Sequence, residues 1–164
     1  PLFISANLII GLFYFFIDLQ IWNANVTPPP LVTYEIKYRL SPEPYSIRLY
    51  DKESLFSGKL HAVICRGWKS RVKGRDLYDY VFYLQNDIKF NLKHLQERLI
   101  DSNFITRDDE FNLEIVKNIL KRRFEQIDFN EAKDDAKPFI KDKDALNIWS
   151  KEFFISITDS LKCI

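Results

Sequence analysis

Methionine is absent from this 164-residue chain, glycine occurs only four times and cysteine only twice. The two cysteines, Cys65 and Cys163, match no metal-ligand spacing, and so little cysteine suits a reducing, cytoplasmic setting. We expect Cys65, in an apolar helical stretch, to be a small core residue. Because the chain starts at Pro1, either an initiator methionine has been removed or the sequence is part of a longer protein.

Neither sign of charge is in excess, since 24 basic residues face 23 acidic ones. This balance excludes a chain whose whole surface binds nucleic acid, so any such role must be local, in the basic cluster of residues 66–75. With 46% apolar and 29% charged residues, the chain can build an ordinary globular core. Its length suits one domain with a small appendage.

A long apolar run covers residues 2–22, but it is interrupted by polar residues and a glycine: Ser5, Asn7, Gly11, Asp18 and Gln20. A membrane-spanning helix needs roughly 20 apolar residues. A signal peptide needs an early positive charge, and no basic residue precedes Lys37. Aromatic and β-branched residues favour one or two buried strands here, with a membrane anchor or a partly disordered remnant as alternatives.

The periodicity of apolar residues predicts an α+β fold, with a few N-terminal strands followed by a mainly helical bundle. After the break at Pro28–Pro30, residues 31–40 and 45–50 alternate as a hairpin would. The expected division is a strand-rich region, 1–50, and a helical region, 51–164. Further helices are predicted over these ranges: 92–100, 111–127 with Asp108 or Asp109 as its cap, 130–136 and 144–161.

The chain is organised around residues 58–85, which are predicted to form a helix, a basic turn and a second helix. The first helix is capped by Asp51 and ends at Gly67. Lys59 and Arg66 project from one face of it, about two turns apart. The turn carries three basic residues with no acid to neutralise them: Lys69, Arg71 and Lys73.

The second helix is predicted to begin near Arg75. Its core face holds Leu77, Val81 and Leu84, while another face holds Asp76, Asp79, Tyr80 and Tyr83. Arg75 and Asp79 have the spacing of a helical ion pair. Two interpretations follow from spacing alone: a solvated basic turn, or a phosphate site in which cations surround one or two carboxylates. His61 and His94 have no suitably spaced partner, and we expect no chemical role for either.

Two charged motifs carry a family resemblance. They are Lys59–Ala62, of the form K-x-x-A, and Lys73–Asp79, of the form K-x-R-D-x-x-D. In this order and at this gap they resemble the AbiEii/AbiGii toxin nucleotidyltransferases, which look like distant members of the DNA polymerase β superfamily. The resemblance runs from about Thr27 to the C-terminus.

This resemblance implies the transfer of a nucleotide, with Mg²⁺ and a nucleoside triphosphate, to tRNA, another RNA or a protein. The system would be one of type IV toxin–antitoxin or phage abortive infection, with an antitoxin as partner. It implies that Lys59, Asp76 and Asp79 are catalytic, and that nucleotide phosphates are bound by Lys59, Arg66, Lys73 and Arg75. It assigns no metal ligand.

The same family pattern needs an N-terminal glycine-containing turn followed by Asp-x-Asp on a strand, and the N-terminal part of the chain has no such Asp-x-Asp. Before Glu35 its sole acid is Asp18, and Asn23 and Asn25 stand where the family tends to carry acids. We therefore expect a C-terminal portion of such an enzyme, inactive alone. The alternatives are a non-catalytic module that binds a nucleotide or RNA through its basic turn, and a membrane-anchored domain using residues 2–22.

Overall fold

The computed structural model describes residues 31–40, 44–66 and 72–164. Over these residues a two-stranded sheet precedes a bundle of helices, which confirms the predicted α+β class. In chain order the elements are β1 (Tyr34–Arg39), β2 (Tyr45–Tyr50), α1 (Lys52–Cys65), α2 (Gly74–Gln85), α3 (Leu92–Asp101), α4 (Leu113–Phe124), α5 (Phe129–Ala136), η1 (Lys137–Phe139), η2 (Lys143–Leu146) and α6 (Lys151–Thr158).

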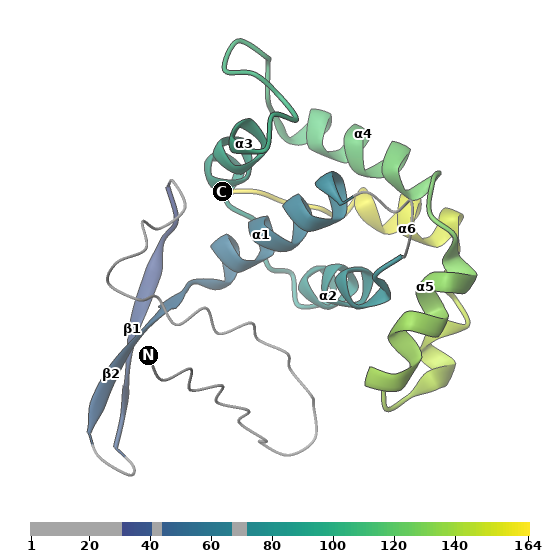
Figure 1. Ribbon diagram of the computed structural model, residues 1–164, viewed down its shortest axis with the longest axis horizontal. Helices are drawn as coiled ribbons and strands as arrows, with labels where there is room; N and C mark the ends of the chain where they lie inside the picture. The colour runs from purple at the N-terminus through teal and green to yellow at the C-terminus, as the bar shows by residue number, and fades with distance from the viewer. Residues whose placement is uncertain (1–30, 41–43, 67–71) are drawn as a thin grey trace.

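The predicted hairpin is confirmed, because β1 and β2 pair antiparallel with Tyr34 opposite Tyr50 and Arg39 opposite Tyr45. It projects from the helical body at the start of α1 (Figure 1). Several of its large apolar side chains are exposed, including Ile36 and Tyr38. A backbone hydrogen bond from Asp51 N to Thr33 O ties the base of the hairpin to the helical body.

Helix α1 lies at the centre of the bundle, between α2 and α3 in Figure 1. The predicted cap is confirmed, since Asp51 Oδ1 accepts a hydrogen bond of 2.8 Å from Ser54 N. The buried face of α1 consists of Ser54, Phe56, Ser57, Leu60, Val63 and Ile64. Because neighbouring helices cover this face, the orientation of the remaining faces of α1 is fixed.

An aromatic cluster joins α2 to α4 and α6, and the predicted core face of α2 is wrong in one respect. Tyr80 is fully buried rather than on a polar face. Its ring centroid lies 5.4 Å from that of Phe124 and 6.3 Å from that of Phe154. Its hydroxyl lies 2.9 Å from Thr158 Oγ1, so the buried polar atom has a partner.

Helix α2 meets α5 at a very close approach. A Cβ added to Gly74 would lie 1.9 Å from Ala132 O, so only glycine fits here without a shift of backbone. Next to it, Val72 N donates to Glu131 Oε1 at 2.9 Å. One side of α5 therefore packs against the start of α2.

Two predictions in the C-terminal half are wrong. Helix α4 is capped by Asn112, whose side chain accepts from Ile115 N at 3.0 Å, and not by Asp108 or Asp109. The single helix expected over 144–161 is broken into η2 and α6, because Ser150 Oγ accepts from Phe153 N and starts a new helix. A serine side chain can accept a hydrogen bond from a nearby backbone N–H group, and so favours the start of a helix over its continuation.

The C-terminal residues return to the start of α3. Phe90 N donates to Lys162 O at 3.0 Å, and Ile164 N donates to Phe90 O at 2.9 Å. None of the helices within the described ranges has the length and apolarity to cross a membrane. The apolar run 2–22 and the turn residues Lys69 and Arg71 lie outside the described residues.

Candidate nucleotide and phosphate site

A cavity of about 360 Å³ lies over one face of α1, between α2 and α3. Its volume is in the range of small-molecule sites. The residues that line it come from β2, α1, α2 and α3: Tyr50, Ser54, Leu55, Gly58, Lys59, His61, Ala62, Cys65, Arg66, Asp76, His94 and Arg98.

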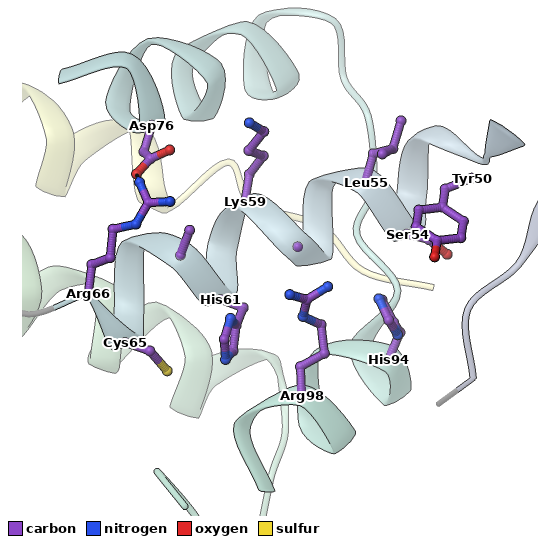
Figure 2. A pocket seen from close by; sticks show the side chains of 12 residues that line it. Tyr50, Ser54, Leu55, Lys59, His61, Cys65, Arg66, Asp76, His94 and Arg98 are labelled. Carbon is purple, nitrogen blue, oxygen red and sulfur yellow. Dashed lines mark hydrogen bonds and ion pairs between the residues drawn. The ribbon is translucent and has the colours of Figure 1, made fainter. Parts of the chain in front are cut away.

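The predicted cationic face of α1 forms part of this cavity. Lys59 and Arg66 both line it, with the small residues Gly58 and Ala62 along the same helix (Figure 2). Gly58 and Ala62 are four residues apart in α1, Lys59 and Ala62 are three apart, and Arg66 directly follows the helix as its C-cap. The small residues Gly58 and Ala62, beside and between the two long cations, leave room for a ligand.

Each cation on this face contacts an acid of the second motif. Lys59 Nζ lies 2.8 Å from Asp79 Oδ2, and Arg66 donates to Asp76 Oδ2. The two contacts connect α1 to α2 across the predicted basic turn. Solvent-exposed ion pairs contribute only about 0–1 kcal/mol to stability, and where one partner is buried, as Asp76 is, the cost of removing its charge from water offsets part of the attraction. Their main effect here is therefore to fix the direction of the two cations.

Asp76 is the most buried charged group of the site, with 6% of its surface exposed. Burial raises the pKa of its carboxyl above the ordinary value. Arg66, Lys59 and Lys73 act in the opposite direction and favour the charged form. The structure thus places three predicted cations around one predicted carboxylate.

Two predicted phosphate ligands do not line the cavity. Lys73 lies at the N-cap of α2, close enough to influence Asp76. The guanidinium of Arg75 lies 4.6 Å from the centroid of the Phe139 ring, which directs it to η1. Of the six predicted site residues, Lys59, Arg66 and Asp76 line the cavity, and Asp79 is attached to it through Lys59.

Sequence reasoning missed the wall that α3 contributes. His94 and Arg98 point from α3 toward α1 (Figure 2). Their spacing of four places them on one helix face, but no motif connects α3 with the first two helices. His94 is almost fully buried, and Arg98 is half-buried.

A polar cluster occupies one end of the cavity. His61 Nε2 lies 3.2 Å from Ser102 Oγ, and Cys65 Sγ lies 3.5 Å from the same oxygen. Burial, with the nearby charge of Arg98, lowers the pKa of His61, and burial raises the pKa of Cys65. Cys65 is thus half-buried at the cavity wall rather than fully inside the core, and its thiol is held in the unreactive protonated form.

The described part of the chain offers no metal site made of three or more protein ligands. Mg²⁺ prefers carboxylate oxygens in octahedral geometry. Within ranges 31–40, 44–66 and 72–164, no group of three or more histidine, cysteine or acidic side chains could hold a metal ion. Asp76 and Asp79 each contact a cation instead. A protein site built from three such ligands would draw on residues outside these ranges.

Comparison with known proteins identifies a family. The family model described as nucleotidyl transferase AbiEii toxin, type IV toxin–antitoxin system, matches residues 17–155, which is most of the chain. No curated protein and no solved structure matches the chain. The matched range contains both motifs and the whole cavity.

Proposed function

The chain belongs to the AbiEii nucleotidyl transferase toxin family, and from this premise we propose that it binds a nucleoside triphosphate for Mg²⁺-dependent transfer to an RNA or protein acceptor. The observation that carries the proposal is the pairing of the two motifs at one cavity. Lys59 and Arg66 from the first helix contact Asp79 and Asp76 from the second. Cations held in fixed directions beside an open cavity suit the charge of a triphosphate.

In this proposal the side chains of Lys59 and Arg66 contact phosphate. Each is positioned by the aspartate that it contacts in the second motif. Nucleotidyl transfer depends mostly on positioning and on stabilising charge at the phosphates. A cation that is already oriented loses less conformational entropy when it contacts a phosphate. Asp76 and Asp79 then act through Arg66 and Lys59, which makes them positioning residues. Lys73 and Arg75 are proposed to contact phosphate or acceptor from the edge of the site.

Mg²⁺, when bound, would neutralise phosphate charge and polarise the reacting phosphoryl group. Because Asp76 and Asp79 each contact a cation, no step in the proposal passes through them as metal ligands. Asn23, Asn25 and Asp18 lie outside the described residues. The N-terminal part of this sequence has no Asp-x-Asp, so we propose that a complete site takes its glycine turn and Asp-x-Asp from residues that this sequence does not contain.

The partners proposed are those of a type IV toxin: an antitoxin, and tRNA, another RNA or a protein as acceptor. A cytoplasmic location goes with this role. We also propose that residues 1–50 extend the nucleotidyltransferase sheet and that 51–164 form the helical domain. The exposed apolar side chains of the hairpin support this division, because such side chains favour coverage by further structure.

A transfer assay tests the proposal. The full chain is incubated with each labelled nucleoside triphosphate, Mg²⁺ and bulk tRNA, beside Lys59→Ala and the control Lys52→Ala. Lys52 is an exposed lysine at the start of the same helix and does not line the cavity. We expect nucleotide binding that Lys59→Ala weakens and Lys52→Ala leaves intact. In a complete enzyme, Lys59→Ala and Asp76→Ala each abolish transfer; full activity in either variant would sink the assignment.

A second candidate is a non-catalytic module that binds a nucleotide or RNA. It is favoured by the engagement of both motif acids with cations and by the lack of a three-ligand metal set within the described residues. Salt-sensitive RNA binding without any transfer would support it, because phosphate contacts release counterions. Labelling that depends on Lys59 would exclude it.

A further inference from the structure

The cavity holds a third cation, Arg98, in addition to Lys59 and Arg66. Arg98 lies on α3 and reaches the wall of α1. One of its terminal nitrogens lies 3.5 Å from the position that a Cβ on Gly58 would occupy. The guanidinium therefore lies against α1, one residue away from Lys59.

Arg98 differs from the other partly buried arginines in having no acceptor among the described residues. Arg75 lies over the Phe139 ring, and Arg123 donates to the backbone oxygens of Val63 and Arg66 at the end of α1. None of the ion pairs or side-chain hydrogen bonds within the described ranges uses the guanidinium of Arg98. Burial lowers the pKa of Arg98, which means that its charge has lost water without gaining an acid in contact.

The charges of the cavity are unevenly compensated. Lys59 and Arg66 each contact a carboxylate, so most of their charge is balanced before any ligand arrives. The charge of Arg98 is not balanced in this way. An arginine offers five donors in a planar fork that matches two oxygens of one phosphate. The capacity to attract an anion into this cavity is therefore concentrated on α3.

We propose that Arg98 is the primary phosphate-binding residue of the cavity and grips the polyphosphate of the nucleotide against Gly58 and Lys59. The inference rests on the proposed function in one respect, the identity of the ligand as a nucleoside triphosphate. The anion site itself rests on the cavity and on the uncompensated guanidinium. Gly58 contributes by leaving α1 bare where the guanidinium and a phosphate meet.

Binding measurements test this. Inorganic tripolyphosphate and each nucleoside triphosphate are titrated into the full chain by calorimetry, with Arg98→Ala, Arg98→Lys and Arg107→Ala beside the wild type. Arg107 is the matched control, because it is exposed and forms a bidentate pair with Glu97 of α3. A charge-assisted hydrogen bond contributes about 1.5–3 kcal/mol, so Arg98→Ala should weaken tripolyphosphate binding by about 10-fold to 150-fold. Arg98→Lys should restore part of it, and Arg107→Ala should bind as the wild type does.

The folded state is checked by circular dichroism and thermal unfolding without ligand. Because Arg98→Lys keeps both the stem and the charge, it provides a folded comparison even if Arg98→Ala loses packing.

The outcomes separate the two proposals. If tripolyphosphate binds in a manner that depends on Arg98 and no nucleoside triphosphate binds, the anion site is supported and the assignment of a nucleotide as its ligand is refuted. Equal binding by Arg98→Ala and wild type overturns the inference, and so does a wild type that binds neither ligand. Suppose that a nucleoside triphosphate bound to the wild type is displaced by an RNA strand with a 5′-hydroxyl but not by tripolyphosphate. This result would overturn the inference in favour of a contact with the RNA backbone.

Discussion

Two glycines in helices should respond to alanine with opposite signs. Gly58 lies inside α1, where a Cβ would meet Arg98 at 3.5 Å, an ordinary contact. Gly74 is the first residue of α2, where a Cβ would lie 1.9 Å from a backbone oxygen of α5. Helix propensity alone favours alanine at both positions, by up to about 1 kcal/mol. The structure predicts that this gain survives only at Gly58.

The magnitude at Gly74 follows from the nature of the obstacle. The nearest atom is the carbonyl oxygen of Ala132, and its carbon lies 2.9 Å from the added Cβ, so α5 itself must move. Overpacking of this kind costs about 1–3 kcal/mol, and more where backbone is displaced. A gain of about 1 kcal/mol at Gly58 and a loss of about 1–3 kcal/mol at Gly74 separate the two variants by about 2–4 kcal/mol.

Urea and thermal unfolding followed by circular dichroism measure this difference. For a chain of this size, 1 kcal/mol corresponds to a shift in Tm of about 2–4 °C. Gly58→Ala should melt above the wild type and Gly74→Ala below it. A Gly74→Ala variant as stable as the wild type would refute the close packing of α2 on α5.

Three further predictions concern a cap and two acidic groups. Ser150→Ala removes the hydroxyl that accepts a hydrogen bond from Phe153 N at the start of α6, and should lower the free energy of unfolding in urea by about 1 kcal/mol. An unchanged urea midpoint would contradict the break before α6. Burial raises the pKa of Tyr83 to about 12, so the fold loses stability as pH rises from about 10 through 12, and Tyr83→Phe should remove the tyrosine absorbance step near that pH. Because burial raises the pKa of Asp76, the folded state holds that proton more tightly, and wild-type stability should fall relative to Asp76→Asn as pH rises from about 4. The opposite slope would mean that the contact with Arg66 outweighs burial.

Local features of the fold could be predicted from the sequence because they depend on neighbouring residues. Alternation over 45–50 matches β2, and the cap at Asp51 lies at the start of α1. The shared face of Lys59 and Arg66 follows from helical spacing alone. Their common position at the cavity was therefore open to prediction before the structure.

Features that depend on tertiary packing could not be predicted in the same way. Tyr80 looks amphipathic in sequence, and only Thr158, far along the chain, supplies the partner that lets its hydroxyl be buried. The continuous apolar spacing after 144 hides the break, because Ser150 can either continue a helix or start one. Arg98 carries no motif, and its place at the cavity depends on the packing of α3 on α1.

The two motifs acquire a physical meaning from this arrangement. Lys59 and Arg66 are each paired with an acid of the second motif across α1 and α2. A ligand phosphate must compete with those acids for Lys59 and Arg66. It need not compete within the described residues for Arg98. An anion is therefore expected to meet Arg98 first and to draw the paired cations toward it afterwards. In the proposed order, Asp76 and Asp79 would orient Arg66 and Lys59 without closing the site, and Arg98 would determine the affinity for the anion.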